Sequence, residues 1–155
     1  MMLRIISFDM DGTLVDTTYA DKVWLEGIPI LYAQEHGMDF DTAREEVRKA
    51  YDTIGEGDVR WYELSYWFTR FGLKGSYENV LDRYMDAIHV FDDVIPVLRY
   101  LHESYGLIVA SNAHRDFLTR TLQYVDGFID HVFSATSDFR EVGKSPDFFM
   151  NICQV

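Results

Sequence analysis

The stretch IISFDMDGTLVD, which runs from Ile5 to Asp16, places two aspartates and a glycine directly after a short apolar run. The run from Leu3 to Phe8 has no clear period and ends at polar turn residues, so it predicts a strand buried on both faces. Asp9 and Asp11 then stand at the carboxyl end of this strand, and Gly12 lets the chain turn sharply. Because two such close carboxylates repel each other, we expect a cation or a shared proton to compensate them.

The strand pattern returns twice later in the chain. It is clear at LIVAS, Leu107 to Ser111, which Asn112 ends, and weaker at HVFSA, His131 to Ala135. Helices are expected at about residues 93–104 and 115–124, on either side of the second strand. The order strand, helix, strand, helix, strand is typical of a parallel sheet covered by helices. The two ends of the chain are therefore predicted to form one α/β core.

Residues 17–90 predict a helical module inserted between the first two strands, because each of its segments carries one apolar stripe. The expected boundaries are a kink or new helix at Pro29, a stop at Gly37, an N-cap at Asp41, stops at Gly55 and Gly72, and a start at Ser76. The aromatic residues of the module are expected mainly in its core; they are Trp24, Trp61, Tyr62, Tyr66, Trp67, Phe68 and Phe71.

Composition narrows the class of protein. The 155 residues carry a formal charge of −12, which argues against nucleic acid and against an anionic membrane as the main partner. Cys153 is the single cysteine, so an internal disulfide is excluded and a reducing compartment is favoured. No apolar segment is long enough to cross a bilayer. We expect a globular cytoplasmic protein.

The carboxylates fit a magnesium site. Ligands of open α/β sheets gather beyond the carboxyl ends of the strands, where Asp9 and Asp11 stand. Mg²⁺ prefers oxygen and commonly uses one or two carboxylates together with substrate phosphate. A calcium loop of the EF-hand type is excluded, because the positions that need Gly and Glu hold Leu14 and Ala20. Taken alone, the aspartates could also form a solvated turn with a helix cap.

Three motifs in this order resemble the haloacid dehalogenase-like (HAD) hydrolase superfamily. DMDGTLVD resembles the first motif, and LIVASN, with Ser111 and Asn112, resembles the second. GKSPDFF resembles the third, with Lys144, although Ser145 stands where the family usually has proline. The helical insert is similar to the α-helical cap of one subgroup. The resemblance implies a Rossmann-like core of three layers (αβα), made of residues 1–16 and 91–155, with a cap at 17–90.

The resemblance also implies the chemistry. It makes the protein a Mg²⁺-dependent phosphatase of a small phosphorylated metabolite, in which Asp9 is the nucleophile that forms an aspartyl-phosphate. Asp11 would be the general acid and then the general base. Asp9 and the backbone carbonyl of Asp11 would bind the metal, and Ser111, Asn112 and Lys144 would bind the phosphoryl group. Dehalogenases of the family usually lack the second aspartate, so Asp11 favours phosphoryl transfer.

Several alternatives stay open. A phosphomutase acting on a sugar phosphate would share every motif, and a non-catalytic binding protein could use the same fold. Ser111 and Asn112 could merely cap a helix, and Lys144 could be an ordinary surface lysine. His114 is expected to be an exposed or helix-terminal histidine.

The family's fourth motif, an acidic pair that completes the Mg²⁺ site, is missing from this sequence, which ends 11 residues after Lys144. Its strand would lie beside the first strand, which would otherwise have an exposed apolar edge. We therefore expect the sequence to be part of a longer protein. On this hypothesis the 155 residues alone bind Mg²⁺ poorly and have little phosphatase activity.

Overall fold

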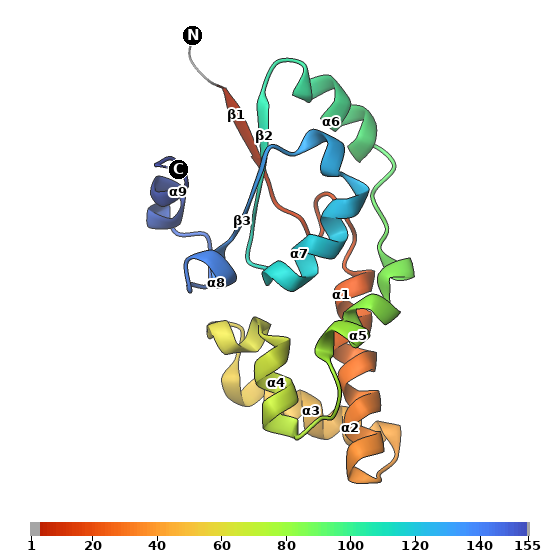
Figure 1. The fold of residues 1–155 in the computed structure, drawn as a ribbon. Helices are drawn as coiled ribbons and strands as arrows, with labels where there is room; N and C mark the ends of the chain where they lie inside the picture. Colours follow the sequence, from red (N-terminus) through yellow and green to blue (C-terminus); the bar gives the residue numbers. More distant parts are fainter. Residues whose placement is uncertain (1–3, 155) are drawn as a thin grey trace. The chain divides into compact units, whose positions relative to one another are not determined.

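The computed structural model describes residues 4–154, and these residues contain a parallel sheet of three strands (Figure 1). The strands are β1 (Ile5–Phe8), β2 (Gly106–Ser111) and β3 (His131–Ser134), in the order β1-β2-β3. The two later strands match the predicted segments to within one residue, and the parallel arrangement is confirmed. The predicted start of the first strand, Leu3, lies outside the described residues.

The register places the strand ends together. Phe8 pairs with Val109, and Ser111 pairs with Ser134. Because the strands are parallel, the residues that follow them emerge at the same edge of the sheet. Asp9 therefore begins its turn beside the carboxyl end of β2.

The burial of β1 differs from the prediction. The strand alternates exposed and half-buried residues, and Ile5 is 53% exposed, whereas five of the six residues of β2 are buried. The reason is position: β1 lies at the edge of the described sheet and pairs with β2 alone, while β2 has a neighbour on each side. Burial on both faces was the wrong expectation for this strand.

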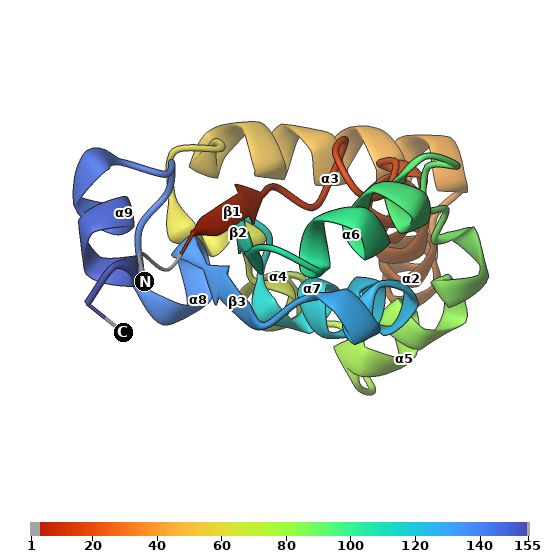
Figure 2. The ribbon, with the colours of Figure 1, turned by 90° about the horizontal axis from the view of Figure 1, so that it is seen from above.

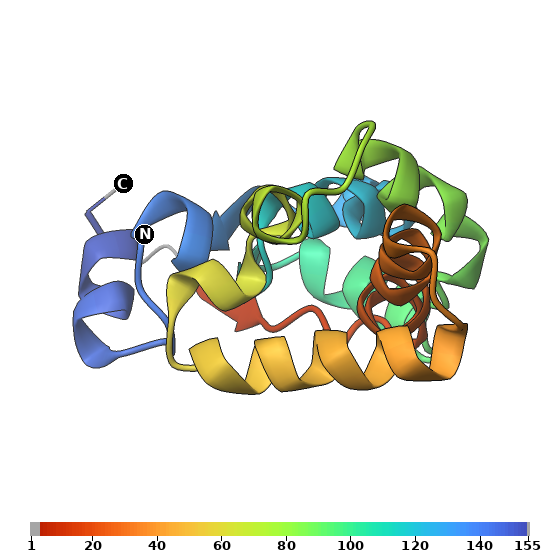
Figure 3. The ribbon, with the colours of Figure 1, turned by 90° about the horizontal axis from the view of Figure 1, so that it is seen from below.

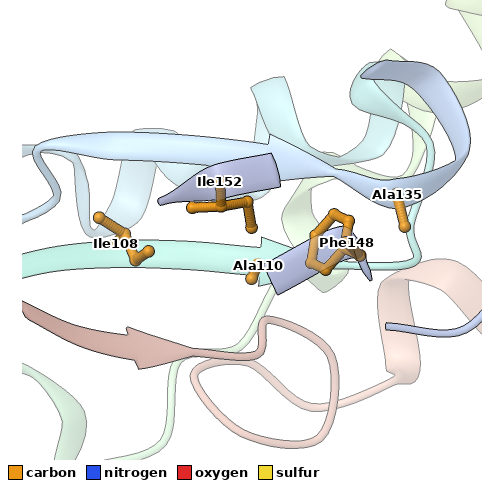
Figure 4. Close-up of a cluster of buried hydrophobic side chains, with 5 residues drawn as sticks. All are labelled: Ile108, Ala110, Ala135, Phe148 and Ile152. Atoms are coloured by element: carbon orange, nitrogen blue, oxygen red, sulfur yellow. The ribbon is translucent and has the colours of Figure 1, made fainter. Parts of the chain in front are cut away.

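Helices cover both faces of the sheet. In Figures 1 and 2, α6 (Val94–His102) and α7 (Arg115–Thr121) lie on one side and α9 (Pro146–Ile152) lies on the other. Figure 4 shows how α9 is attached: its Phe148 and Ile152 pack on Ile108 and Ala110 of β2 and on Ala135. Side chains alternate along a strand, so the buried Leu107 and Val109 point to the opposite face. The α/β fold class is confirmed.

The helices beside the sheet follow the predicted order with shifted ends. Asp93 precedes α6, and α7 continues as short 3₁₀ turns, Leu122–Tyr124 and Asp126–Phe128. A short helix, α8 (Ala135–Asp138), follows β3 directly. Ala135 was expected in the strand, but Ser134 caps α8 by accepting a hydrogen bond from Ser137 N at 3.0 Å, which ends the strand one residue earlier.

The chain divides into two compact units, one made of the residues up to Thr17 and those from Ile88 onward, the other of Thr18–Ala87. The second unit is helical. Its elements are α1 (Thr18–Lys22), a π-helical turn (Val23–Gly27), α2 (Ile28–His36), α3 (Phe40–Ile54), a 3₁₀ turn (Val59–Tyr62), α4 (Leu64–Phe71), α5 (Tyr77–Arg83) and a 3₁₀ turn (Met85–Ala87). Figure 3 shows α3 along its length.

Most helix boundaries of this unit were predicted correctly. Pro29 lies in the first turn of α2, Gly37 and Gly72 end helices in the left-handed conformation, and Ser76 caps α5. The predicted N-cap Asp41 is wrong. The carboxylate of Asp39 accepts a hydrogen bond from Thr42 N at 3.0 Å, so α3 begins two residues earlier than expected.

Aromatic side chains form the centre of the helical unit, as expected for Trp67, Phe68 and Phe71, which are buried. The Trp67 ring packs edge-on against Tyr51 at 4.7 Å and stacks on Phe71 at 5.3 Å between ring centroids. Trp67 Nε1 donates to the carbonyl of Trp61 at 3.1 Å. The other four aromatics of the predicted set are half-buried. Within residues 4–154, no helix has the length and apolar character needed to cross a membrane.

Candidate active site

The turn that follows β1 is fixed by its backbone. Met10 is fully buried, and its carbonyl accepts hydrogen bonds from the amides of Thr13 at 3.2 Å and Leu14 at 2.9 Å. Gly12 has φ +75°, which L-residues rarely adopt, and its amide donates to the carbonyl of Val15 at 2.7 Å. The expected sharp turn at Gly12 is confirmed, and it holds Asp9 and Asp11, both half-buried, at the end of the strand.

Lys144 lies against Asp9. Its Nζ is 3.1 Å from Asp9 Oδ2 and donates to the carbonyl oxygen of Ala110 at 3.2 Å. The other carboxylate oxygen, Oδ1, accepts from the amide of Met10 at 2.9 Å. The ammonium thus joins the end of β1 to the end of β2 and offsets the charge of one aspartate. The Asp9 side chain is 40% exposed, so a ligand can reach it.

Ser111 ends β2 beside this ion pair and is 2% exposed. Its Oγ accepts a hydrogen bond from the amide of Ala113 at 3.1 Å. Among the described residues, no acceptor is found for the proton of the Ser111 hydroxyl. A buried hydroxyl without an acceptor is costly, so a ligand oxygen at this position would be stabilised.

Asn112 connects the second predicted motif to the third. Its Oδ1 accepts a hydrogen bond from the amide of Gly143 at 3.1 Å, directly before Lys144. In the part of the chain that the structure describes, Nδ2 of Asn112 has no partner and can donate to a ligand. The structure therefore brings Asp9, Ser111, Asn112 and Lys144 to one edge of the sheet.

The oxygen atoms at the end of β1 suit a hard cation. The carboxylate of Asp9 and the carbonyl of Asp11 are the kinds of ligand that Mg²⁺ prefers. Over residues 4–154, however, no three side chains of Asp, Glu, His or Cys gather in the way a complete metal site requires. The described residues thus fit Mg²⁺ as a partial ligand set, which phosphate and water oxygens commonly complete.

His114 lies at the N-terminus of α7, next to an acidic residue of the first turn. Its Nδ1 lies 3.1 Å from Asp116 Oδ2, and the His114 side chain is 22% exposed. The hydrogen bond from His114 lowers the pKa of the Asp116 carboxyl below its usual value. The expectation of a helix-terminal histidine is confirmed.

Two buried hydroxyls beside the site were not singled out from the sequence. Ser134 and Thr136 are 0% exposed, and they hydrogen-bond to the carbonyls of Ala113 and Asn112 at 2.8 and 2.9 Å. Their signal in the sequence was a run of small hydroxyl residues at the carboxyl end of a predicted strand, which is where ligands of parallel sheets collect.

The helical unit has a separate open pocket of about 1060 Å³. Apolar and aromatic side chains from the π-helical turn, α2 and α3 line it, among them Trp24, Pro29 and Tyr51. Arg44 and Arg48 of α3 and the acidic Glu26 contribute charge.

Known proteins are similar to this chain. GMP/IMP nucleotidase YrfG of Escherichia coli (strain K12) is 29% identical over 133 residues, which cover 83% of this chain and 58% of the relative. The YrfG protein of Shigella flexneri matches equally. The chain thus spans little more than half the length of these curated relatives.

Solved structures share the fold. A HAD phosphatase from Thermococcus onnurineus has a TM-score of 0.79 and 23% identity, covering 97% of this chain and 69% of the other. L-2-haloacid dehalogenase from Xanthobacter autotrophicus has a TM-score of 0.53 and 20% identity, covering 99% and 65%. The family model described as "Hydrolase: haloacid dehalogenase-like hydrolase" matches residues 3–155. With this match over nearly its whole length, the chain belongs to the haloacid dehalogenase-like hydrolase family.

Proposed function

We propose that the protein is a Mg²⁺-dependent phosphatase that hydrolyses a small phosphorylated metabolite through an aspartyl-phosphate on Asp9. One observation carries the proposal: the Lys144 ammonium contacts both the Asp9 carboxylate and the carbonyl that precedes Ser111. An accessible carboxylate, a cation and a hydroxyl proton thus lie together at one edge of the sheet. The cation and the hydroxyl proton suit the negative oxygens of a phosphoryl group.

The proposed reaction has two steps. An oxygen of Asp9 attacks phosphorus, the bond from phosphorus to the ester oxygen breaks, and Asp11 gives that oxygen a proton. Asp11 then takes a proton from water, whose oxygen attacks phosphorus and releases the Asp9 carboxylate and inorganic phosphate. Ser111, Asn112 Nδ2 and Lys144 bind the phosphoryl oxygens throughout. Bound at Asp9 and the Asp11 carbonyl, Mg²⁺ would supply further positive charge against the phosphoryl oxygens.

Nucleoside monophosphates are the substrate class that we propose. The name of the YrfG relatives states activity on GMP and IMP. We also propose that the protein acts in the cytoplasm.

The test is release of inorganic phosphate from GMP, IMP and p-nitrophenyl phosphate with Mg²⁺. Asp9→Asn should abolish release, whereas Asp52→Asn, an exposed aspartate of α3, should leave it unchanged. Acid quenching during turnover should leave one phosphoryl group on the peptide that holds Asp9. Turnover by Asp9→Asn would refute the nucleophile, and an isomerised phosphate ester in place of free phosphate would favour a phosphomutase.

A further inference from the structure

We propose that Thr136 is a positioning residue that orients the Ser111 hydroxyl through the peptide group between Asn112 and Ala113. The inference rests on the proposed function in one respect, since it takes Ser111 as a phosphoryl ligand. It adds residues of the third strand's end to the site.

The hydrogen bonds form an unbroken series. Thr136 Oγ1 donates to the carbonyl of Asn112 at 2.9 Å. The amide of the same peptide group, Ala113 N, donates to Ser111 Oγ at 3.1 Å. A trans peptide group is planar with its C=O and N–H pointing in opposite directions, so fixing the carbonyl also aims the amide. Hydrogen bonds in series also polarise and strengthen one another.

The direction of the series decides where the Ser111 proton goes. Ser111 Oγ accepts from Ala113, so one of its lone pairs is occupied and its own proton must point elsewhere. Ser111 is 2% exposed, and no acceptor for this proton occurs within the described residues. A negatively charged phosphoryl oxygen can accept a hydrogen bond from this proton. Thr136 thereby prepares Ser111 as a donor.

Ser134 strengthens the arrangement at the next peptide group. Its Oγ donates to the carbonyl of Ala113 at 2.8 Å. Ser134 Oγ and Thr136 Oγ1 are 3.3 Å apart, but each hydroxyl has a single proton, and carbonyl oxygens can only accept. Both protons are therefore committed to the loop that follows β2, and the two hydroxyls hold two successive carbonyls.

The short helix that carries Thr136 is itself held in place. Asp138 Oδ2 accepts from the amide of Ser134 at 2.8 Å, and Asp138 Oδ1 accepts from Arg115 Nε at 3.0 Å. The amide of Arg115 donates to Ser137 Oγ at 2.9 Å. The contacts of Arg115 with Ser137 and Asp138 join α8 to the start of α7. They therefore fix the position of the short helix that carries Thr136.

The experiment compares Thr136→Val with Thr121→Val in the full chain. Thr121 is a matched control because it is 1% exposed and its hydroxyl donates only within α7, to the carbonyls of Phe117 and Leu118, each at 3.2 Å. Both variants replace a buried hydroxyl by a methyl group of the same size. Three quantities are measured: the amide resonance of Ala113, the rate of its hydrogen exchange, and the dissociation constant for orthophosphate.

We expect Thr136→Val to shift the Ala113 amide resonance, to speed its exchange and to weaken orthophosphate binding by about tenfold. Thr136→Ser should restore all three quantities, and Thr121→Val should change none of them, although it loses comparable stability. An unchanged Ala113 amide in folded Thr136→Val, or unchanged phosphate affinity despite a shifted amide, would overturn the inference. If the unaltered protein bound no phosphate while the Ala113 amide responded as expected, the proposed function would fail and the series of hydrogen bonds would stand.

Discussion

The ammonium of Lys144 lies 3.1 Å from the carboxylate of Asp9, although 135 positions separate the two residues in the sequence. The same ammonium donates to the carbonyl of Ala110. Repulsion between Asp9 and the nearby Asp11 would oppose this turn, and the lysine offsets part of that charge. Because both side chains of the ion pair are partly exposed, its main effect is expected on ligand binding rather than on folding.

Replacing Lys144 by methionine should therefore weaken phosphate binding far more than stability. A charge-assisted hydrogen bond contributes about 1.5–3 kcal/mol, which corresponds to about a ten- to hundredfold loss of orthophosphate affinity. The free energy of unfolding should change by less than about 1 kcal/mol. Isothermal titration with orthophosphate and urea unfolding measure the two effects.

Lys74→Met is the matched control for this lysine. Lys74 Nζ forms an ion pair with Glu35 Oε1 at 2.6 Å on the helical unit and is 84% exposed. The variant should bind orthophosphate as tightly as the unaltered protein does. Equal affinity in Lys144→Met and Lys74→Met would remove Lys144 from the proposed phosphate site.

A second prediction concerns the hydroxyl of Ser111. Ser111→Ala removes the acceptor of the Ala113 amide and the proton proposed for the phosphoryl group. We expect a loss of about 1 kcal/mol in stability and at least a fivefold loss of phosphate affinity, which is about 1 kcal/mol of binding free energy. Both are measured as for Lys144.

Ser76→Ala serves as the control for the serine, because Ser76 Oγ caps α5 by accepting from Glu78 N at 3.2 Å. Its loss should also cost about 1 kcal/mol of stability, as helix N-caps do. Phosphate affinity should stay unchanged in this variant. If the affinity fell equally in both serine variants, general destabilisation would explain the result and Ser111 would have no special role.

The sequence predicted which residues lie together at the strand ends better than it predicted the details of packing. Apolar runs that end in Asp9 and in Ser111 could be recognised as strands, and parallel strands bring their carboxyl ends together. The burial of β1 depends on how many strands flank it, which its own four residues do not encode. Thr136 was missed because its role requires the pairing of Ser111 with Ser134, a register that arises only when the sheet forms.

Helix boundaries illustrate a second limit. Glycines at Gly37 and Gly72 end helices because few other residues accept their left-handed backbone, so the signal is specific. The prediction placed the N-cap of α3 at Asp41, whereas Asp39, a residue of the same capping propensity two positions earlier, is the cap. The hydrogen bond that Thr42 N donates to the Asp39 carboxylate decides between them, and this geometry depends on the path of the preceding chain.

The pair of His114 and Asp116 predicts a pH dependence with a definite sign. The pKa of Asp116 is lowered in the folded protein, mainly by the hydrogen bond from His114. Its stabilising effect should be present above the unfolded pKa of about 3.9 and should be lost as the pH falls through the lower folded pKa. NMR titration of the Asp116 carboxyl carbon measures the folded value directly.

His114→Ala should raise the Asp116 pKa towards its ordinary value. The pH range between the folded and the unfolded pKa of Asp116 should therefore become narrower. In urea unfolding, Asp116→Asn should be less stable than the unaltered protein at pH 5, by about 0.5–1 kcal/mol for a charge at a helix N-terminus. The difference should shrink as the pH falls below 4. An Asp116 pKa that does not respond to His114→Ala would show that another group lowers it.

Gly27 gives the sharpest prediction for the helical unit, because general helix propensity and local packing disagree there. Alanine in a helical position normally gains about 1 kcal/mol over glycine. A Cβ at Gly27, however, would lie 2.6 Å from Val80 Cγ1 and 2.9 Å from Tyr84 Cε2. Valine is stiff about χ1, so we expect Gly27→Ala to destabilise the protein by about 1–3 kcal/mol in urea unfolding.

Gly57→Ala is the control, because nothing lies within 4 Å of a Cβ at Gly57, and it should be nearly neutral. Val80→Ala should reduce the loss of stability that Gly27→Ala causes. If Gly27→Ala were stabilising, the close packing of the π-helical turn against α5 would be wrong.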